Sequence, residues 1–248
     1  NPALGMCTVV PEMNPSQPSK INPKKIVDSI LKNQVTNSFG SPVIWSIILK
    51  YCQAEQIVLP SLKRVIMAGA PAPQALLEQL KEYMPNGEIF TPYGATEALP
   101  VSSLSATEII EKQVGELAYG RKGNCVGRAM PNTRIQIIEP DEGVIGSIAN
   151  VKECVTGEIG EIIVSGPTVT QMYDELPEAT KLSKIKDIDF FWHRMGDMGW
   201  LDEAGFLWFC GRKAERVKAN EGILETVCCE AIFNQLECVS RSALIDLG

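Results

Sequence analysis

The stretch Arg64-Val65-Ile66-Met67-Ala68-Gly69-Ala70-Pro71-Ala72-Pro73 decides the fold, because an apolar run ends there in a glycine and two prolines. Residues 64–68 have the length and apolar content of a buried strand. Proline lacks the N–H that a sheet interior needs but is tolerated in the first turn of a helix, so we expect the strand to stop and a helix to span residues 75–84. A buried strand followed directly by a helix is the unit of a parallel sheet with crossover helices. This part of the chain is therefore predicted to be α/β.

The same alternation surrounds this stretch. The pattern predicts helices over 23–32 and 42–51, and strands over 4–10, 36–39 and 89–90. Two successive strands, 64–68 and 89–90, end in loops at one edge of the sheet. Open α/β sheets bind ligands at such an edge.

The pattern changes in the second half of the sequence to short strands between glycines, at 133–139, 145–151 and 160–166, and to a hairpin through 204–205 into 206–209. Residues 176–186 are charged and weakly helical, and Gly211-Arg212-Lys213 is expected to be a charged break after a strand. A helix over 226–235 and a strand over 242–245 would begin a new unit. We therefore predict an α/β subdomain (1–112), a β-rich, mostly antiparallel, barrel-like subdomain (113–210) and the start of a small α+β unit (211–248).

Composition excludes several classes of function. The 248 residues carry a formal net charge of −7 and no long basic run, which argues against a nucleic-acid partner. No apolar run approaches the roughly 20 residues needed to span a bilayer, and no signal peptide opens the sequence, so a cytoplasmic location is expected. The eight cysteines form no CxxC pair and there is one histidine, which argues against a zinc site or a disulfide framework. Because the sequence opens on Asn1, we expect it to be a piece of a longer protein.

The stretch Thr91-Pro92-Tyr93-Gly94-Ala95-Thr96-Glu97-Ala98-Leu99 holds the strongest candidate site, since an aromatic ring, a glycine, a hydroxyl and a carboxylate fall within five positions. Gly94 can adopt backbone angles closed to other residues, so Tyr93 and Thr96 could face one ligand from a tight turn. Glu97 would reach a phosphate-bound Mg²⁺, which prefers carboxylate oxygens. The alternative is a helix N-terminus, with Thr96 as the cap and Tyr93 in the core.

Two further signals follow in the sequence: the segment 194–197, which ends in Asp197, and the pair Gly211-Arg212. Alone, Asp197 can also be explained as a turn residue beside Gly196, and Arg212 as a surface charge after a strand. Together with the stretch 93–97, in this order and at these spacings, they resemble the adenylate-forming superfamily of acyl-CoA synthetases, peptide-synthetase adenylation domains and luciferases. The resemblance covers essentially the whole chain. It implies that residues 1–112 are a nucleotide-binding subdomain and that residues 211–248 are the hinge and the start of a small lid domain.

The resemblance implies a role for each matching residue. The backbone of Gly69-Ala70-Pro71 would line an adenine and Tyr93 would stack on its ring, with Gly94 in the same nucleotide-binding turn. Thr96 would contact the α-phosphate of ATP or AMP, and Glu97 would hold Mg²⁺; these two are the catalytic candidates. Asp197 would bind both ribose hydroxyls, because a carboxylate accepts two donors at once, and the Arg212 guanidinium would reinforce that contact. His193 could act near neutral pH, but packing beside Trp192 is favoured.

Four stretches, 39–42, 93–100, 192–197 and 229–235, look like the β-lactone synthetases of bacterial long-chain olefin biosynthesis. That group activates a β-hydroxy fatty acid with ATP and closes it to a β-lactone, because the substrate's own hydroxyl attacks the acyl adenylate at high effective concentration. The resemblance implies a small carboxylic acid as substrate, ATP or AMP and Mg²⁺ as cofactors, and membership of a multi-enzyme assembly.

The sequence departs from the superfamily pattern at three places, and the last two, Ala214 and the loop at 218–222, put the use of CoA in doubt. Met195 replaces the usual threonine before Gly196, Ala214 stands at the hinge position two after Arg212, and the glycine-containing loop is altered at 218–222. A fatty acyl-CoA ligase is the alternative, and a catalytically silent AMP-binding or scaffold module is an alternative of another class. The superfamily's phosphate loop and C-terminal catalytic lysine would lie outside residues 1–248. We therefore expect these residues alone to form no acyl adenylate at a useful rate.

Overall fold

The structure, a computed structural model, describes residues 4–111, 123–220, 222–234, 236, 238–239 and 241–246. The chain divides into two compact units, and each is considered by itself. The first comprises residues 1–91 and 105–112, and the second residues 92–104 and 113–248. The boundary expected at 112/113 falls outside the described residues, and the division at 210/211 stays a prediction.

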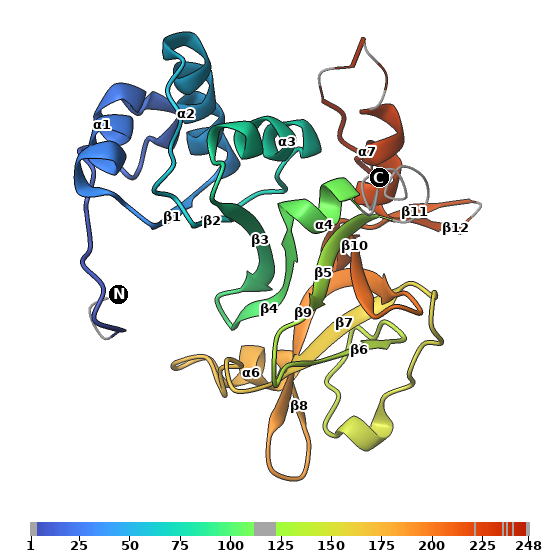
Figure 1. Cartoon of the computed structure of the whole chain (residues 1–248). Coiled ribbons are helices and arrows are strands. Elements are labelled where there is room, and N and C mark those ends of the chain that lie inside the picture. The colour runs from blue at the N-terminus through green and yellow to red at the C-terminus, as the bar shows by residue number, and fades with distance from the viewer. Residues whose placement is uncertain are drawn as a thin grey trace. The chain divides into compact units, whose positions relative to one another are not determined.

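The first unit is the predicted α/β layer. Its main elements in chain order are α1 (Pro23–Asn33), β1 (Asn37–Gly40), α2 (Pro42–Glu55), β2 (Arg64–Met67), α3 (Gln74–Tyr83), the start of β3 (Glu88–Ala95) and α4 (Ala106–Glu111), preceded by a short 3₁₀ turn (Pro18–Lys20). Strands β1, β2 and β3 pair in parallel in that order, with Ser38 opposite Val65 and Val65 opposite Ile89. Figure 1 shows α1, α2 and α3 gathered beside the short strands β1 and β2.

Local sequence signals set the helix starts in this unit. Pro23 and Pro42 occupy the first helical turns, and the side chains of Asn22 and Ser41 cap them by accepting hydrogen bonds from the backbone N–H groups of Lys25 and Ile44. The helices then bury their apolar faces in one core with the strands, represented by Trp45 of α2, Val65 of β2 and Leu77 of α3. The parallel sheet with crossover helices predicted from residues 64–73 is thereby confirmed.

Two expectations for this unit need correction. Residues 4–10 form no strand, and Leu4 and Val10 are 77% and 84% exposed, so the apolar side chains there have no sheet face to cover. The short strand expected at 89–90 is instead the start of the eight-residue β3, which continues through Tyr93 and Gly94.

The second unit is antiparallel, as predicted. Its sheet contains β4 (Ala98–Ser105), β5 (Asn124–Ala129), β6 (Arg134–Ile138), β7 (Gly160–Ser165), β9 (Phe191–Leu201) and β10 (Phe206–Arg212) in the order β4-β5-β10-β9-β7-β6, and β8 (Lys184–Lys186) pairs with β9. In the described residues β4 pairs with β3 as well as with β5, and it shares no ladder with β6. Between β7 and β8 lies α6 (Pro177–Ser183), and β11 (Val217–Ala219), β12 (Gly222–Leu224) and α7 (Thr226–Phe233) follow β10.

Two strands predicted in this unit do not form. Residues 145–151 contain a 3₁₀ turn, Ile148–Asn150, capped by the Ser147 side chain, instead of a strand. Residues 242–245 are not extended into a sheet, because the N–H groups of Ser242 and Leu244 donate to the side chains of Asn234 and Glu230. The helix expected over 226–235 ends at Phe233, and residue 235 is outside the described part. Among the described residues, no helix is long and apolar enough to cross a membrane.

Candidate functional site

Tyr93, Gly94, Thr96 and Glu97 lie in a β-hairpin of the second unit. Tyr93 and Gly94 end β3, residues 96 and 97 form the turn, and β4 begins at Ala98. The alternative of a helix N-terminus capped by Thr96 is therefore wrong. Gly94 has no positive φ, contrary to our expectation; a Cβ at this position would lie 2.5 Å from the Ala98 carbonyl oxygen, so close backbone approach is what requires glycine.

Asp197 lies in the middle of β9 and is 3% exposed. Its Oδ2 accepts a hydrogen bond of 2.5 Å from the Tyr93 hydroxyl, and its Oδ1 accepts one of 2.6 Å from Nη1 of Arg212. The Tyr93 ring is tilted against the ring of Phe209, with centroids 6.0 Å apart. The structure therefore brings together the aromatic ring, the carboxylate and the guanidinium that the sequence singled out.

Arg212 reaches this position because β10 continues further than expected. The predicted charged break at Gly211-Arg212 is wrong: both residues belong to β10, and Arg212 pairs with Asp197 across the ladder after a register shift between Phe209 and Gly211. Gly211 has a φ of +137°, and a Cβ there would lie 2.5 Å from Oγ1 of Thr226, so glycine is required at the shift. The Arg212 side chain remains 55% exposed and is accessible to a ligand.

The charges of this group follow from burial. Burial raises the pKa of the Asp197 carboxyl, and the hydrogen bonds from Tyr93 and Arg212 oppose that rise. Burial, followed by the nearby Asp197 charge, raises the pKa of Tyr93 well above its ordinary value. Tyr93 consequently keeps its proton and acts as a donor. A carboxylate has about four lone-pair sites, so two remain for further donors after these contacts.

Glu97, in the turn, belongs to a second polar group. Its Oε1 accepts a hydrogen bond of 2.7 Å from the Tyr173 hydroxyl, and its backbone oxygen accepts one of 2.8 Å from the N–H of Thr170. The bond from Tyr173 is the main cause that lowers the pKa of Glu97, so this side chain is ionised near neutral pH. Thr96, beside it in the turn, is exposed.

Lys184 and His193 are buried in the same region of the second unit. Burial lowers the pKa of Lys184 to about 8 and that of His193, with help from the Lys184 charge, to about 4. His193 is 3% exposed and its Nδ1 has no hydrogen-bond partner among the described residues. These observations fit the packing role that we favoured for His193 over an acid–base role.

Gly69, Ala70 and Pro71 follow β2 in the first unit, where they form an exposed loop with Gly69 at a φ of +93°. The other predicted site residues belong to the second unit. Sequence reasoning missed Tyr173, Thr170 and Lys184, because no local motif marks them and their contacts join segments far apart in the chain.

Mg²⁺ fits Glu97 only as part of a nucleotide complex. No group of three or more His, Cys, Asp or Glu side chains in the described residues could hold a metal ion by itself. Mg²⁺ usually keeps several waters and binds through one or two carboxylates plus substrate phosphates. A single ionised, partly exposed carboxylate matches that mode of binding.

The chain is similar to known proteins in sequence. Residues 3–174 match the protein family described as AMP-binding enzyme. The whole chain is 36% identical to the olefin β-lactone synthetase of Stenotrophomonas maltophilia, of which it covers 45%. Over 82% of its length it is 30% identical to the mitochondrial medium-chain acyl-CoA ligase of Mus musculus, of which it covers 30%.

The fold also matches solved structures. O-succinylbenzoate coenzyme A synthetase from Bacillus subtilis, in complex with ATP and magnesium ion, superposes with a TM-score of 0.70 at 23% identity, over 92% of this chain and 43% of that one. The chain thus spans less than half the length of the relatives named here.

Proposed function

Because this chain belongs to the AMP-binding enzyme family, we propose that it carries the nucleotide-binding part of an enzyme that activates a carboxylic acid as an acyl adenylate. In that reaction a carboxylate oxygen attacks the α-phosphorus of ATP, and pyrophosphate leaves. The observation that carries the proposal is the buried Asp197 carboxylate, held by Tyr93 and Arg212 with two acceptor sites left over. Two vicinal ribose hydroxyls supply two donors.

Each predicted residue has a task in this scheme. Asp197 accepts the ribose hydroxyls, and Arg212 keeps the carboxylate oriented and charged. Tyr93 presents its ring to adenine. The role of Gly69-Ala70-Pro71 at the adenine edge stays a prediction from the sequence. Thr96, exposed in the turn, donates its hydroxyl to the α-phosphate.

Glu97 is the proposed carboxylate ligand of Mg²⁺. When bound, the ion neutralises charge that develops on the phosphate oxygens. Within this chain, the ionised state of Glu97 and its bond to Tyr173 prepare the carboxylate for such a ligand.

We further propose β-lactone formation as the second step: the β-hydroxyl oxygen of the substrate attacks the acyl carbon, AMP leaves, and the hydroxyl proton is released. The olefin β-lactone synthetase that matches the whole chain supports this step. Similarity to acyl-CoA ligases favours thioester formation as the second candidate, with a fatty acid as substrate. Ala214 and the altered loop at 218–222 argue against CoA transfer.

The reaction is tested by mass spectrometry of products from the full-length protein that contains these residues, incubated with ATP, Mg²⁺ and a long-chain β-hydroxy acid, with and without CoA. A β-lactone and AMP formed without CoA are the expected products. A thioester that appears only with CoA would reverse the order of the two candidates. A folded full-length protein that binds AMP but forms neither product would favour the scaffold alternative.

The nucleotide site is tested separately by calorimetric titration of AMP into the chain and its Asp197→Asn variant. Since hydrogen bonds to a charged group contribute about 1.5 to 3 kcal/mol, the variant should bind AMP about ten- to a hundred-fold more weakly. Asp28→Asn makes the same charge change on the exposed side of α1 and should leave AMP affinity unchanged. Equal affinities in the folded Asp197 and Asp28 variants would refute the ribose assignment.

A further inference from the structure

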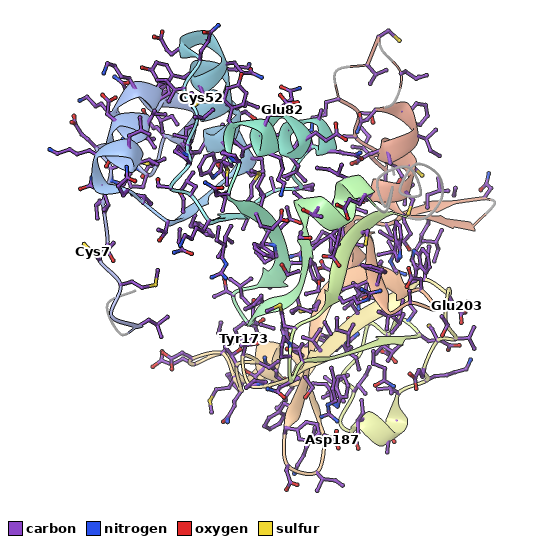
Figure 2. The ribbon with its side chains drawn as sticks, in the orientation of Figure 1. Cys7, Cys52, Glu82, Tyr173, Asp187 and Glu203 are labelled. Carbon is purple, nitrogen blue, oxygen red and sulfur yellow. The ribbon has the colours of Figure 1, made fainter. Side chains whose placement is uncertain are left out.

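Tyr173 contacts the proposed metal ligand but lies outside every motif that the sequence singled out. It lies on the segment that leads into α6 and is labelled in Figure 2. Its hydroxyl donates to Oε1 of Glu97 over 2.7 Å.

The segment that carries Tyr173 is fixed at several points. The Tyr173 N–H donates to Oγ1 of Thr180 in α6 over 3.0 Å. On the turn side, the N–H of Thr170 donates to the Glu97 backbone oxygen, and Val169 forms an isolated antiparallel bridge with Ala98. Tyr173 is therefore a donor on an anchored segment, because these contacts hold the backbone around it beside both the turn and α6.

A carboxylate on a two-residue turn has several rotamers, and ordering it costs conformational entropy. A donor held in place by its own backbone removes part of that cost before a ligand arrives, which is the general effect of preorganisation. We propose that Tyr173 is a positioning residue, whose hydroxyl holds the Glu97 carboxylate in the orientation that receives the divalent cation of a metal–nucleotide complex. This inference rests on the proposed function, in which Glu97 holds Mg²⁺.

The test measures binding and needs no turnover. Mn²⁺ replaces Mg²⁺ as a paramagnetic probe, and electron paramagnetic resonance gives its affinity for the full chain in the presence of ATP, while calorimetry gives the affinity for metal-free AMP. Tyr173→Phe removes one charge-assisted hydrogen bond and should weaken Mn²⁺ binding with ATP about ten-fold, with AMP affinity unchanged. Tyr83→Phe, in α3 of the first unit, makes the same chemical change and should alter neither affinity.

A double-mutant cycle with Glu97→Gln completes the test. If Tyr173 acts through Glu97, Tyr173→Phe should have no further effect on Mn²⁺ affinity in the Glu97→Gln background. An unchanged Mn²⁺ affinity in Tyr173→Phe, when the unaltered chain binds the metal with ATP, overturns the inference and leaves the proposed function standing. Equal losses for AMP and for Mn²⁺ with ATP would make Tyr173 a structural residue and also overturn it. Failure of the unaltered chain to bind AMP would refute the proposed function itself.

Discussion

The buried ion pair between Glu161 of β7 and Arg194 of β9 gives the sharpest prediction for stability. Their side chains are 1% and 4% exposed, and the guanidinium donates to both carboxylate oxygens, over 3.0 and 2.7 Å. Arg194 lies three positions before Asp197 on the same strand, so the pair holds the part of β9 that carries the site. Lys213, just after β10, donates to the same carboxylate over 3.1 Å.

Glu161→Gln keeps the shape of the side chain but leaves the buried Arg194 without its countercharge. Removing one partner of a buried pair costs about 3 to 5 kcal/mol, mostly because the remaining charge stays uncompensated in a low-dielectric interior. Arg194→Met should be similarly costly, since it also leaves the backbone carbonyls of Asp141, Gly143 and Leu182 without that donor. The double variant removes both charges, so its loss should be smaller than the sum of the single losses by at least about 1 kcal/mol.

Urea unfolding followed by tryptophan fluorescence measures these losses, because Trp192, Trp200 and Trp208 all report on the second unit. Lys213→Met is the matched control, since it removes a cation near the same carboxylate while the Glu161–Arg194 contact remains. Its cost should be about 1.5 to 3 kcal/mol, because the buried carboxylate keeps its main countercharge. Additive losses for Glu161→Gln and Arg194→Met, or single losses below that of Lys213→Met, would refute the argument.

Three further predictions concern single residues near the site. His193 is held neutral in the folded chain with a pKa of about 4, whereas the unfolded chain takes up this proton near pH 6.5. The free energy of unfolding should therefore fall as pH falls from about 6.5 to about 4. In His193→Gln this fall, measured by urea unfolding at pH 7 and at pH 4, should be smaller by about 3 kcal/mol. Gly94→Ala should destabilise the hairpin by about 1 to 3 kcal/mol in thermal unfolding, because its Cβ would lie 2.5 Å from the Ala98 carbonyl oxygen, and an unchanged melting temperature would contradict that contact. Tyr93→Phe keeps the ring but removes the donor to Asp197. The affinity for AMP, measured by calorimetry, should therefore fall less than about ten-fold and far less than in Asp197→Asn. A larger loss of affinity would mean that the hydroxyl itself contacts the ligand.

Sequence patterns predicted the first unit well because its signals are local. Prolines and capping side chains mark the starts of α1 and α2, and the apolar run at 64–67 is long enough only for a buried strand. The strand expected at 4–10 shows the limit of the same reasoning. Its apolar residues satisfy a strand pattern, but a strand also needs a neighbour, and no local pattern reports whether one exists.

The sequence predicted which residues form the candidate site better than it predicted the backbone geometry around them. The resemblance selected Tyr93, Asp197 and Arg212, and the structure places them in one hydrogen-bonded group, although their ligand roles remain proposals. Gly94 was selected for the wrong reason: φ preferences are local, whereas the approach of the Ala98 backbone depends on the hairpin that forms around it. The sequence also predicted too short a β10, because a glycine such as Gly211 usually ends a strand. Only the folded chain shows the register shift and the close approach of Thr226 that require glycine there.

The polar group around Glu97 explains why part of any such site escapes sequence reasoning. Tyr173 and Glu97 are 76 positions apart, and neither Tyr173 nor Lys184 stands in a pattern that differs from an ordinary exposed segment. Their roles follow from contacts in the folded chain. The Tyr173 hydroxyl reaches Glu97, and Lys184 is 6% exposed and lies where its charge acts on Glu97 and His193. Burial is a property of the assembled sheet, so the residues that contact a ligand can be recognised from a motif, whereas the residues that orient and charge them are found only in the folded chain.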